Sequence, residues 1–283
     1  MSENGSAQAT GGSRHDLETM SYEVRDGIAL ITFDRPKARN ALDVPMRREL
    51  ASLVSEIRDD DNVRAVILTG GGGVFCAGGD IRGLSEERTS AQSYKRIADL
   101  HVWLPSLVNL EKPVIAAVDG PAFGGGMNLA LTADFILASD TARFCQVFGR
   151  IGLVPDLAGM YLLPRLVGLQ RAKELVFSGR TLRPEEAKDM GIVYSVHSSD
   201  QLLDAAFALA RRFCDASTLA IGLSKNILNQ SFNLDQRAMA ELEAMAQALC
   251  MDSTYHKEAV QRFLDKEPAL FDWERMNKEG SGA

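Results

Sequence analysis

The sequence is poor in the residues that build metal centres and disulfide frameworks. Its 283 residues include only four cysteines and four histidines. The cysteines are far apart in the chain and form no CxxC pair, and the histidines show no zinc-ligand spacing. Scattered thiols are typical of proteins in a reducing compartment. We therefore expect reduced cysteines, a cytoplasmic location and no bound metal ion.

An excess of basic charge and long apolar runs are also missing. The net charge is −7 and no run of lysine or arginine occurs, so nucleic acid is not an expected partner. No apolar stretch approaches the ~20 residues of a membrane-spanning helix, so we expect no membrane association. The first residues are small and polar and lack the apolar segment of a secretory signal. We expect residues 1–17 to form a disordered tail.

Strand and helix patterns alternate through the first two thirds of the chain. Short apolar segments typical of buried strands occur at 27–33, 63–70, 113–120 and 134–139. Between the first two, apolar residues from Met46 to Ile57 recur at helical spacing. Residues 91–110 are also expected to be helical. This alternation predicts an α/β core over residues 18–198.

The pattern changes near residue 200. From there the apolar residues recur almost wholly at helical spacing, as in "QLLDAAFALARRF" and "QRAMAELEAMAQAL". We therefore expect a helical C-terminal subdomain over residues 199–283.

Two of the predicted strands end in glycine-rich turns, "GGGGVFCAGGD" at 70–80 and "FGGGMN" at 123–128. Glycine allows positive φ angles and a close approach of a ligand to the backbone. The second turn opens a helix, whose first amides lack internal partners and attract negative charge. Alone, such turns are equally consistent with tight packing of a helix on a strand. Neither turn fits a nucleotide-binding glycine motif.

Four motifs in order resemble the enoyl-CoA hydratase/isomerase (crotonase) family. They are "DRPKARNAL", "GGGGVFCAGGDI", "AAVDGPAFGGGMNLALTADF" and "GLVPDLAGMYLLPRLVG". The likeness covers roughly residues 20 to 270 and is strongest to the branch of the 1,2-epoxyphenylacetyl-CoA and enoyl-CoA isomerases. It implies a spiral of ββα units with a helical C-terminal subdomain, assembled as a homotrimer or as a hexamer built from two trimers.

The resemblance also implies a substrate and the residues that bind it. Family members bind acyl-CoA thioesters, and two backbone amides stabilise the thioester oxygen; by motif match these belong to Gly79 and Gly125. No cofactor is implied beyond the coenzyme A of the substrate. The implied CoA contacts are Lys37, Ala38, Arg39, Ala77, Asp80 and Ile81, with Phe263 and Lys266 near the end of the chain. Without the resemblance, Lys37 and Arg39 would be interpreted as solvated loop charges.

The two glutamates of a typical family hydratase are absent. The matching positions carry Asn128 and Phe148. Neither an amide nor a phenyl ring can exchange a proton near neutral pH. Simple hydration of a double bond is therefore disfavoured, and both residues are candidates for the lining of an acyl pocket, as is Tyr161.

Asp156, in "GLVPDLAG", is the remaining candidate base. Family isomerases carry an aspartate at this motif position. Its apolar neighbours would raise the pKa of the carboxyl, which makes it a better proton acceptor. The branch usually has two glycines where this chain has Ala158 and Gly159. A structural alternative for Asp156 is a Pro-Asp turn that caps the next helix.

The sequence favours an isomerase of enoyl-CoA or epoxyacyl-CoA that works through an enolate, with Asp156 as the proton shuttle. Three alternatives stay open. The chain could be an enoyl-CoA hydratase or an acyl-CoA-binding protein without catalysis. The same enolate site would also support thioester hydrolysis or carbon–carbon cleavage.

Overall fold

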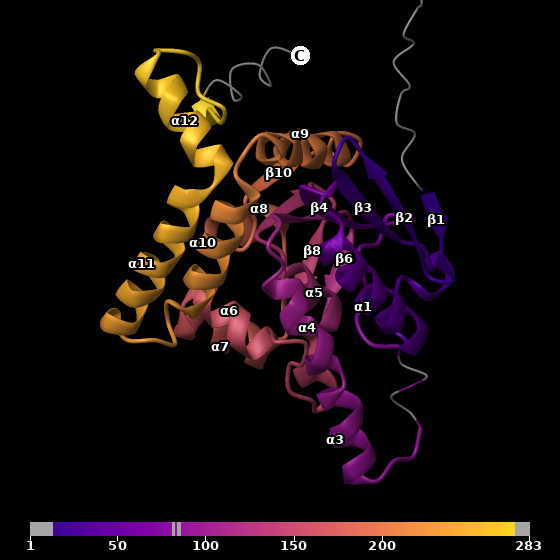
Figure 1. Cartoon of the computed structure of the whole chain (residues 1–283). Helices are drawn as coiled ribbons and strands as arrows, with labels where there is room; N and C mark the ends of the chain where they lie inside the picture. The colour runs from indigo at the N-terminus through magenta and orange to yellow at the C-terminus, as the bar shows by residue number, and fades with distance from the viewer. Residues whose placement is uncertain (1–13, 81–82, 84–85, 275–283) are drawn as a thin grey trace, which may run out of the picture.

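Two β-sheets form the centre of the molecule, in a computed structural model that describes residues 14–80, 83 and 86–274 (Figure 1). Within these residues, the larger sheet has seven strands in the order β1-β2-β3-β4-β5-β7-β10. Their bounds are β1 Arg14–Asp16, β2 Met20–Arg25, β3 Ile28–Phe33, β4 Ala65–Gly70, β5 Val114–Val118, β7 Phe135–Ser139 and β10 Ser195–His197. The pairing is antiparallel from β1 to β3 and parallel from β3 to β10.

A smaller sheet carries the strands that follow β5 and β7 in the chain. In the described part it consists of β6 (Pro121–Phe123), β8 (Arg143–Cys145) and β9 (Thr181–Leu182). The helix α5 (Gly125–Ala130) follows β5 and β6, and α6 (Gly159–Val167) follows β7 and β8 after the short 3₁₀ helix η2 (Val147–Ile151). Each of these segments is a ββα unit, so the predicted α/β class is confirmed.

Helices cover both faces of the larger sheet. Alternate strand residues such as Ile31, Leu68 and Ala116 belong to the core that also contains residues of α1 (Val44–Asp59) and α4 (Leu100–Val108). The other alternate residues, such as Ile67 and Ala117, pack with α9 (Leu202–Cys214). This period-two division places alternate residues of the central strands against two apolar layers. The helix predicted around Met46 and Ile57 is confirmed as α1, and its first turn is capped by Asp43.

One expectation differs from the structure. Residues 14–16 fall in the expected tail, yet they form β1, because their backbone pairs with residues 21–23 of β2. The segment 199–283, expected to be a helical subdomain, begins with α9, which packs against β3, β4, β5, β7 and β10.

The remaining helices surround the core and form an arm at one side. They are η1 (Pro36–Ala38), α3 (Ser90–Ala98), α7 (Leu169–Ser178), α8 (Pro184–Asp189), α10 (Thr218–Gln230), α11 (Gln236–Asp252) and α12 (Thr254–Leu264). In Figure 1, α11 and α12 lie away from the sheets, and exposed apolar residues such as Leu249 and Phe263 lie on them. Among the described residues, no helix is both long and apolar enough to cross a membrane.

Candidate active site

The two glycine-rich turns meet beside the chain segment that precedes α1. The backbone amide of Leu42 donates a hydrogen bond to the carbonyl of Gly78, at 2.7 Å. On the other side, the amide of Phe123 donates to the carbonyl of Cys76, at 3.0 Å. The segment 76–79 is therefore held between residue 42 and β6. This pairing brings Gly79 next to the turn that opens α5.

Close packing fixes the position of the Gly125 amide. Gly125 is the first residue of α5, after Gly124 at φ 53°. A Cβ atom on Gly78 would lie 3.5 Å from the nitrogen of Gly125. Within the described ranges, neither the Gly79 nor the Gly125 amide donates a hydrogen bond to a protein acceptor. The N–H groups of both residues are therefore available to donate hydrogen bonds to a bound ligand.

A cavity of about 250 Å³ lies against both of these glycines. Its lining also includes Phe148, Asp156 and Leu157. A Cβ atom on Gly125 would lie 3.7 Å from Oδ1 of Asp156, so the carboxylate sits directly beside the first turn of α5. The structure thus brings Gly79, Gly125, Phe148 and Asp156 together at one cavity.

One oxygen of the Asp156 carboxylate is held without a hydrogen-bond partner. Its Oδ1 is buried, and no partner for it is present among the described residues. Burial raises the pKa of Asp156 above its ordinary value, and the positive charge of Arg47 opposes that rise only in part. A desolvated carboxylate with raised proton affinity suits proton transfer beside a thioester carbonyl.

Asn128 does not line this cavity, which corrects the sequence-based expectation. Its side chain is fully buried behind the site. Nδ2 donates to the backbone carbonyl of Asp156 at 2.8 Å, and Oδ1 accepts a hydrogen bond from Nε2 of Gln146 at 2.7 Å. A carboxylate at this position would have no N–H for that carbonyl. The amide is therefore a positioning group for the loop of Asp156, and Gln146 is a supporting residue that the sequence did not reveal.

The turn after Asp156 has an unusual backbone. Leu157 and Ala158 have φ angles of 47° and 59°, in the left-handed region that favours glycine. A Cβ atom on Gly159 would lie 2.3 Å from Nδ2 of Asn128, so no side chain fits there. The branch that this chain resembles usually has glycine at both 158 and 159. Glycine is sterically required at 159 in this structure, whereas position 158 carries an alanine with a strained backbone.

A second cavity, of about 950 Å³, shares Ala77 and Gly79 with the first cavity. Its lining includes the implied CoA contacts Lys37, Ala38, Arg39, Ala77 and Asp80. Ile81, the sixth contact of this group, lies outside the described residues. The loop is held by Arg35, which forms ion pairs with Asp43 at 2.6 Å and with Asp80 at 3.7 Å. The sequence alone gives no indication of this role of Arg35.

Three of the predicted site residues lie elsewhere. In the single chain, Phe263 on α12 is 82% exposed, and neither it nor Lys266 lines the two cavities just described. Tyr161 lines another cavity, of about 750 Å³, and its hydroxyl donates to the carbonyl of Asn229 at 3.2 Å. Helix α6 turns this ring away from Asp156, because the positive-φ turn redirects the chain between the two residues.

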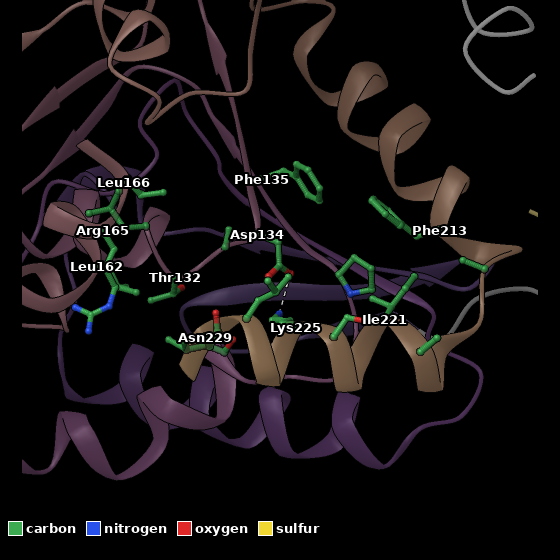
Figure 2. A pocket seen from close by; sticks show the side chains of 18 of the residues that line it. Thr132, Asp134, Phe135, Leu162, Arg165, Leu166, Phe213, Ile221, Lys225 and Asn229 are labelled. Atoms are coloured by element: carbon green, nitrogen blue, oxygen red, sulfur yellow. Dashed lines mark hydrogen bonds and ion pairs between the residues drawn. The ribbon is translucent and has the colours of Figure 1, made fainter. Parts of the chain in front are cut away.

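The cavity that contains Tyr161 is built around an ion pair (Figure 2). Nζ of Lys225 on α10 lies 2.7 Å from Oδ2 of Asp134 and also donates to the carbonyl of Lys112 at 3.2 Å. Asp134 further accepts from the amide of Val114, at 2.7 Å. The acid and the base are thus satisfied by each other and by the backbone. Neither member of this pair is therefore free to act as a proton carrier, and the pair joins α10 to the core.

We expect Lys225→Met to lower the free energy of unfolding by about 2–3 kcal/mol. A fully buried pair would lose about 3–5 kcal/mol when one partner is removed. The Asp134 side chain keeps 25% of its exposure, which reduces the loss. The matched control is Lys95→Met, which breaks an exposed pair with Asp99 and should cost less than about 0.5 kcal/mol. Urea denaturation of both variants measures this, and equal midpoints would contradict the prediction.

Comparison with known proteins agrees with this geometry. The family model of enoyl-CoA hydratase/isomerase matches residues 23–275. The chain is 33% identical to the 1,2-epoxyphenylacetyl-CoA isomerase of Escherichia coli, over 90% of this chain and 98% of that protein. It is 35% identical to the short-chain-enoyl-CoA hydratase of Clostridium acetobutylicum, over 89% of this chain and 96% of that protein.

Solved structures give the same result. The crystal structure of an enoyl-CoA hydratase/isomerase from Cupriavidus metallidurans superposes with a TM-score of 0.87 at 40% identity, over 91% of this chain and 97% of that chain. The predicted fold, a crotonase-like mixed α/β core followed by helices, is therefore confirmed. The chain belongs to the enoyl-CoA hydratase/isomerase family of acyl-CoA enzymes.

Proposed function

We propose that this enzyme moves the double bond of an enoyl-CoA by way of an enolate, with Asp156 as the proton shuttle. The observation that carries the proposal is Oδ1 of Asp156, which is buried, has no hydrogen-bond partner among the described residues and lies at the same cavity as Gly79 and Gly125. In the forward direction, the carboxylate removes a proton from C2 of a 3-enoyl thioester. The electron pair of that bond delocalises onto the thioester oxygen, where the two amides stabilise the charge.

The same carboxylate then returns the proton at C4, which leaves a double bond between C2 and C3. Atoms and charge balance within this cycle, so the proposed reaction needs no redox partner and no metal ion. Coenzyme A enters as part of the substrate. We propose that its phosphates contact Lys37 and Arg39 in the larger cavity, which joins the acyl cavity at Ala77 and Gly79.

Hydration is the second candidate, because relatives named hydratase are as similar to this chain as a relative named isomerase. The residues at the site favour isomerisation. Asn128 is hydrogen-bonded behind the cavity and Phe148 is a hydrocarbon wall, so neither can activate water.

We further propose a homotrimer, or a hexamer of two trimers, in the cytoplasm. The exposed apolar residues on α11 and α12 support a subunit interface there. In such an assembly, Phe263 and Lys266 would contact the coenzyme A of their own or a neighbouring subunit.

Wild-type rates on two substrates test the proposed reaction. We expect the enzyme to convert a 3-enoyl-CoA to the 2-enoyl isomer at least about a hundredfold faster than it hydrates crotonyl-CoA, since only the first reaction uses the groups present. The two products are separated by chromatography and identified by mass, because hydration adds one water. Hydration of crotonyl-CoA at a rate equal to isomerisation would refute the proposal.

A further inference from the structure

The cavity next to Asp156 contains more positive charge than the proposed reaction needs. Arg47, Arg96 and Arg150 all contribute to its lining, and Asp156 is the single acid among its described lining residues. Two of the three guanidinium groups have backbone partners. Nη2 of Arg150 donates to the carbonyl of Gly179 at 2.6 Å, and Nη1 of Arg96 donates to the carbonyl of Gly83 at 2.5 Å.

Arg47 is different, because its side chain has no such partner. It lies on α1 in line with Leu50 and Val54, both buried, so its stem runs along the core face of the helix. Its Nε is buried without a hydrogen bond, and no ion pair of Arg47 occurs among the described residues. Burial lowers the pKa of Arg47, with Asp156 and Asp43 acting in the opposite direction. Arginine still remains charged at neutral pH, so a half-buried positive charge lines the cavity, with no ion-pair partner among the described residues.

The acidic neighbours do not supply that group. Asp43 forms an ion pair with Arg35 at 2.6 Å. Asp156 is near enough to influence Arg47, but the two do not form an ion pair within 4 Å. The guanidinium of Arg47 is therefore free to donate hydrogen bonds to a ligand in the cavity.

The position of Arg47 indicates which part of a substrate would reach it. Arg47 and Arg96 line both the acyl cavity and an adjoining polar cavity of about 650 Å³. An acyl chain that starts at the Gly79 and Gly125 amides and grows through the first cavity would therefore end near these two side chains. A methyl end would leave the charge of Arg47 unpaired, whereas a carboxylate would accept its N–H groups in a bidentate pair.

We propose that the preferred substrate is an acyl-CoA whose acyl chain ends in a carboxylate, and that Arg47 is the residue that selects it, with Arg96 beside it. This inference rests on the proposed acyl-CoA function and specifies its substrate class. It gives Arg47 a role in specificity that is separate from the proton transfer by Asp156.

Binding of two saturated thioesters tests the proposal without turnover. Hexanoyl-CoA and hexanedioyl-CoA have the same number of acyl carbons and differ in the terminal group, and neither has a double bond to move. Calorimetry of the wild-type protein should show hexanedioyl-CoA binding at least about tenfold more tightly, the scale expected for a hydrogen-bonded charge pair. In Arg47→Gln this preference should disappear, while the affinity for hexanoyl-CoA stays within about twofold of wild type.

Arg58→Gln is the matched control, because it removes the same charge from the same helix, and Arg58 is exposed and lines neither the acyl cavity nor the adjoining polar cavity. It should retain the preference. Equal affinities in the wild type, or a preference that survives in Arg47→Gln, would overturn the inference while leaving acyl-CoA binding intact. Failure of both thioesters to bind the wild type would instead overturn the proposed function itself. The wild-type comparison is decisive even if the Arg47 variant does not fold.

Discussion

Replacement of Asp156 by asparagine is expected to slow isomerisation of a 3-enoyl-CoA by at least about a hundredfold, the usual scale for loss of a general base. Asparagine keeps the shape of the side chain and cannot accept the proton. The amides of Gly79 and Gly125 are unchanged, so binding of hexanoyl-CoA should stay close to wild type. Steady-state rates and calorimetry on the same preparation separate the two effects. An undiminished rate in the variant would remove Asp156 from the mechanism.

Stability gives an independent control on this variant. Burial raises the folded-state pKa of Asp156 above its value in the unfolded chain, which is about 3.9. The folded state therefore holds this proton more tightly, and the contribution of Asp156 to stability falls as pH rises from about 4 through the folded-state pKa. At pH 7 the carboxylate is a cost to folding, which asparagine removes. Urea denaturation at pH 7 should therefore show Asp156→Asn at least as stable as wild type.

The same shift predicts the acid limb of the activity profile. Asp156 must be ionised to accept a proton, so kcat/KM should rise with pH up to the raised pKa and then level. The midpoint of that limb should lie above the range of an ordinary aspartate, because burial disfavours the charged form. A midpoint at or below pH 4 would contradict the buried environment described above.

Gly126→Ala is expected to cost about 3 kcal/mol of unfolding free energy, at the upper end of the range for overpacking. The added Cβ would lie 2.1 Å from the carbonyl oxygen of Cys76. That oxygen cannot move freely, because it accepts the amide of Phe123 while the amide of Cys76 donates to Pro121. The turn must shift as a whole, which also displaces the Gly125 amide. Isomerisation should therefore fall together with stability.

Gly79→Ala is the matched control for this effect on stability. No atom lies within 4 Å of a Cβ built on Gly79, and its φ angle is not positive. Its unfolding free energy should stay within about 0.5 kcal/mol of wild type. Chemical denaturation of Gly126→Ala and Gly79→Ala side by side measures the difference in their unfolding free energies. Similar midpoints for both would show that the contact at Cys76 is not as tight as described.

The sequence predicted the features that depend on local pattern. The glycine turns and the amphipathic helix α1 follow from residue type and spacing. The motif order specified the family, and that resemblance indicated Asp156 and Phe148 as site residues. Residues 14–16 escaped prediction because their strand exists only through pairing with β2. The sequence pattern assigned α9 to the C-terminal helical segment and not to the core. An apolar helix face shows that the helix is packed, but not which surface it covers.

Side-chain direction was the main information that the sequence lacked. Asn128 follows the Gly125 amide by three residues, yet its side chain points behind the cavity to Asp156 and Gln146. Tyr161 is five residues from Asp156 and faces another cavity. Arg47 could have been found, because a cation in line with the buried residues Leu50 and Val54 breaks the apolar face of α1. The sequence shows that anomaly, but not the cavity it faces.

The hydrogen bond from Asn128 ends on the main chain of residue 156, not on its side chain. The loop is therefore held in the same way whatever side chain residue 156 carries. Mutations at 156 can change the chemistry of the site without loss of the fold, whereas 128 and 159 tolerate little change, because any side chain on residue 159 would collide with Asn128. Natural selection can thus exchange the reactive group by a single codon substitution while the scaffold is preserved. In a site built in this way, substitution at position 156 can introduce a new reaction, whereas substitution at 128 or 159 would disturb the fold.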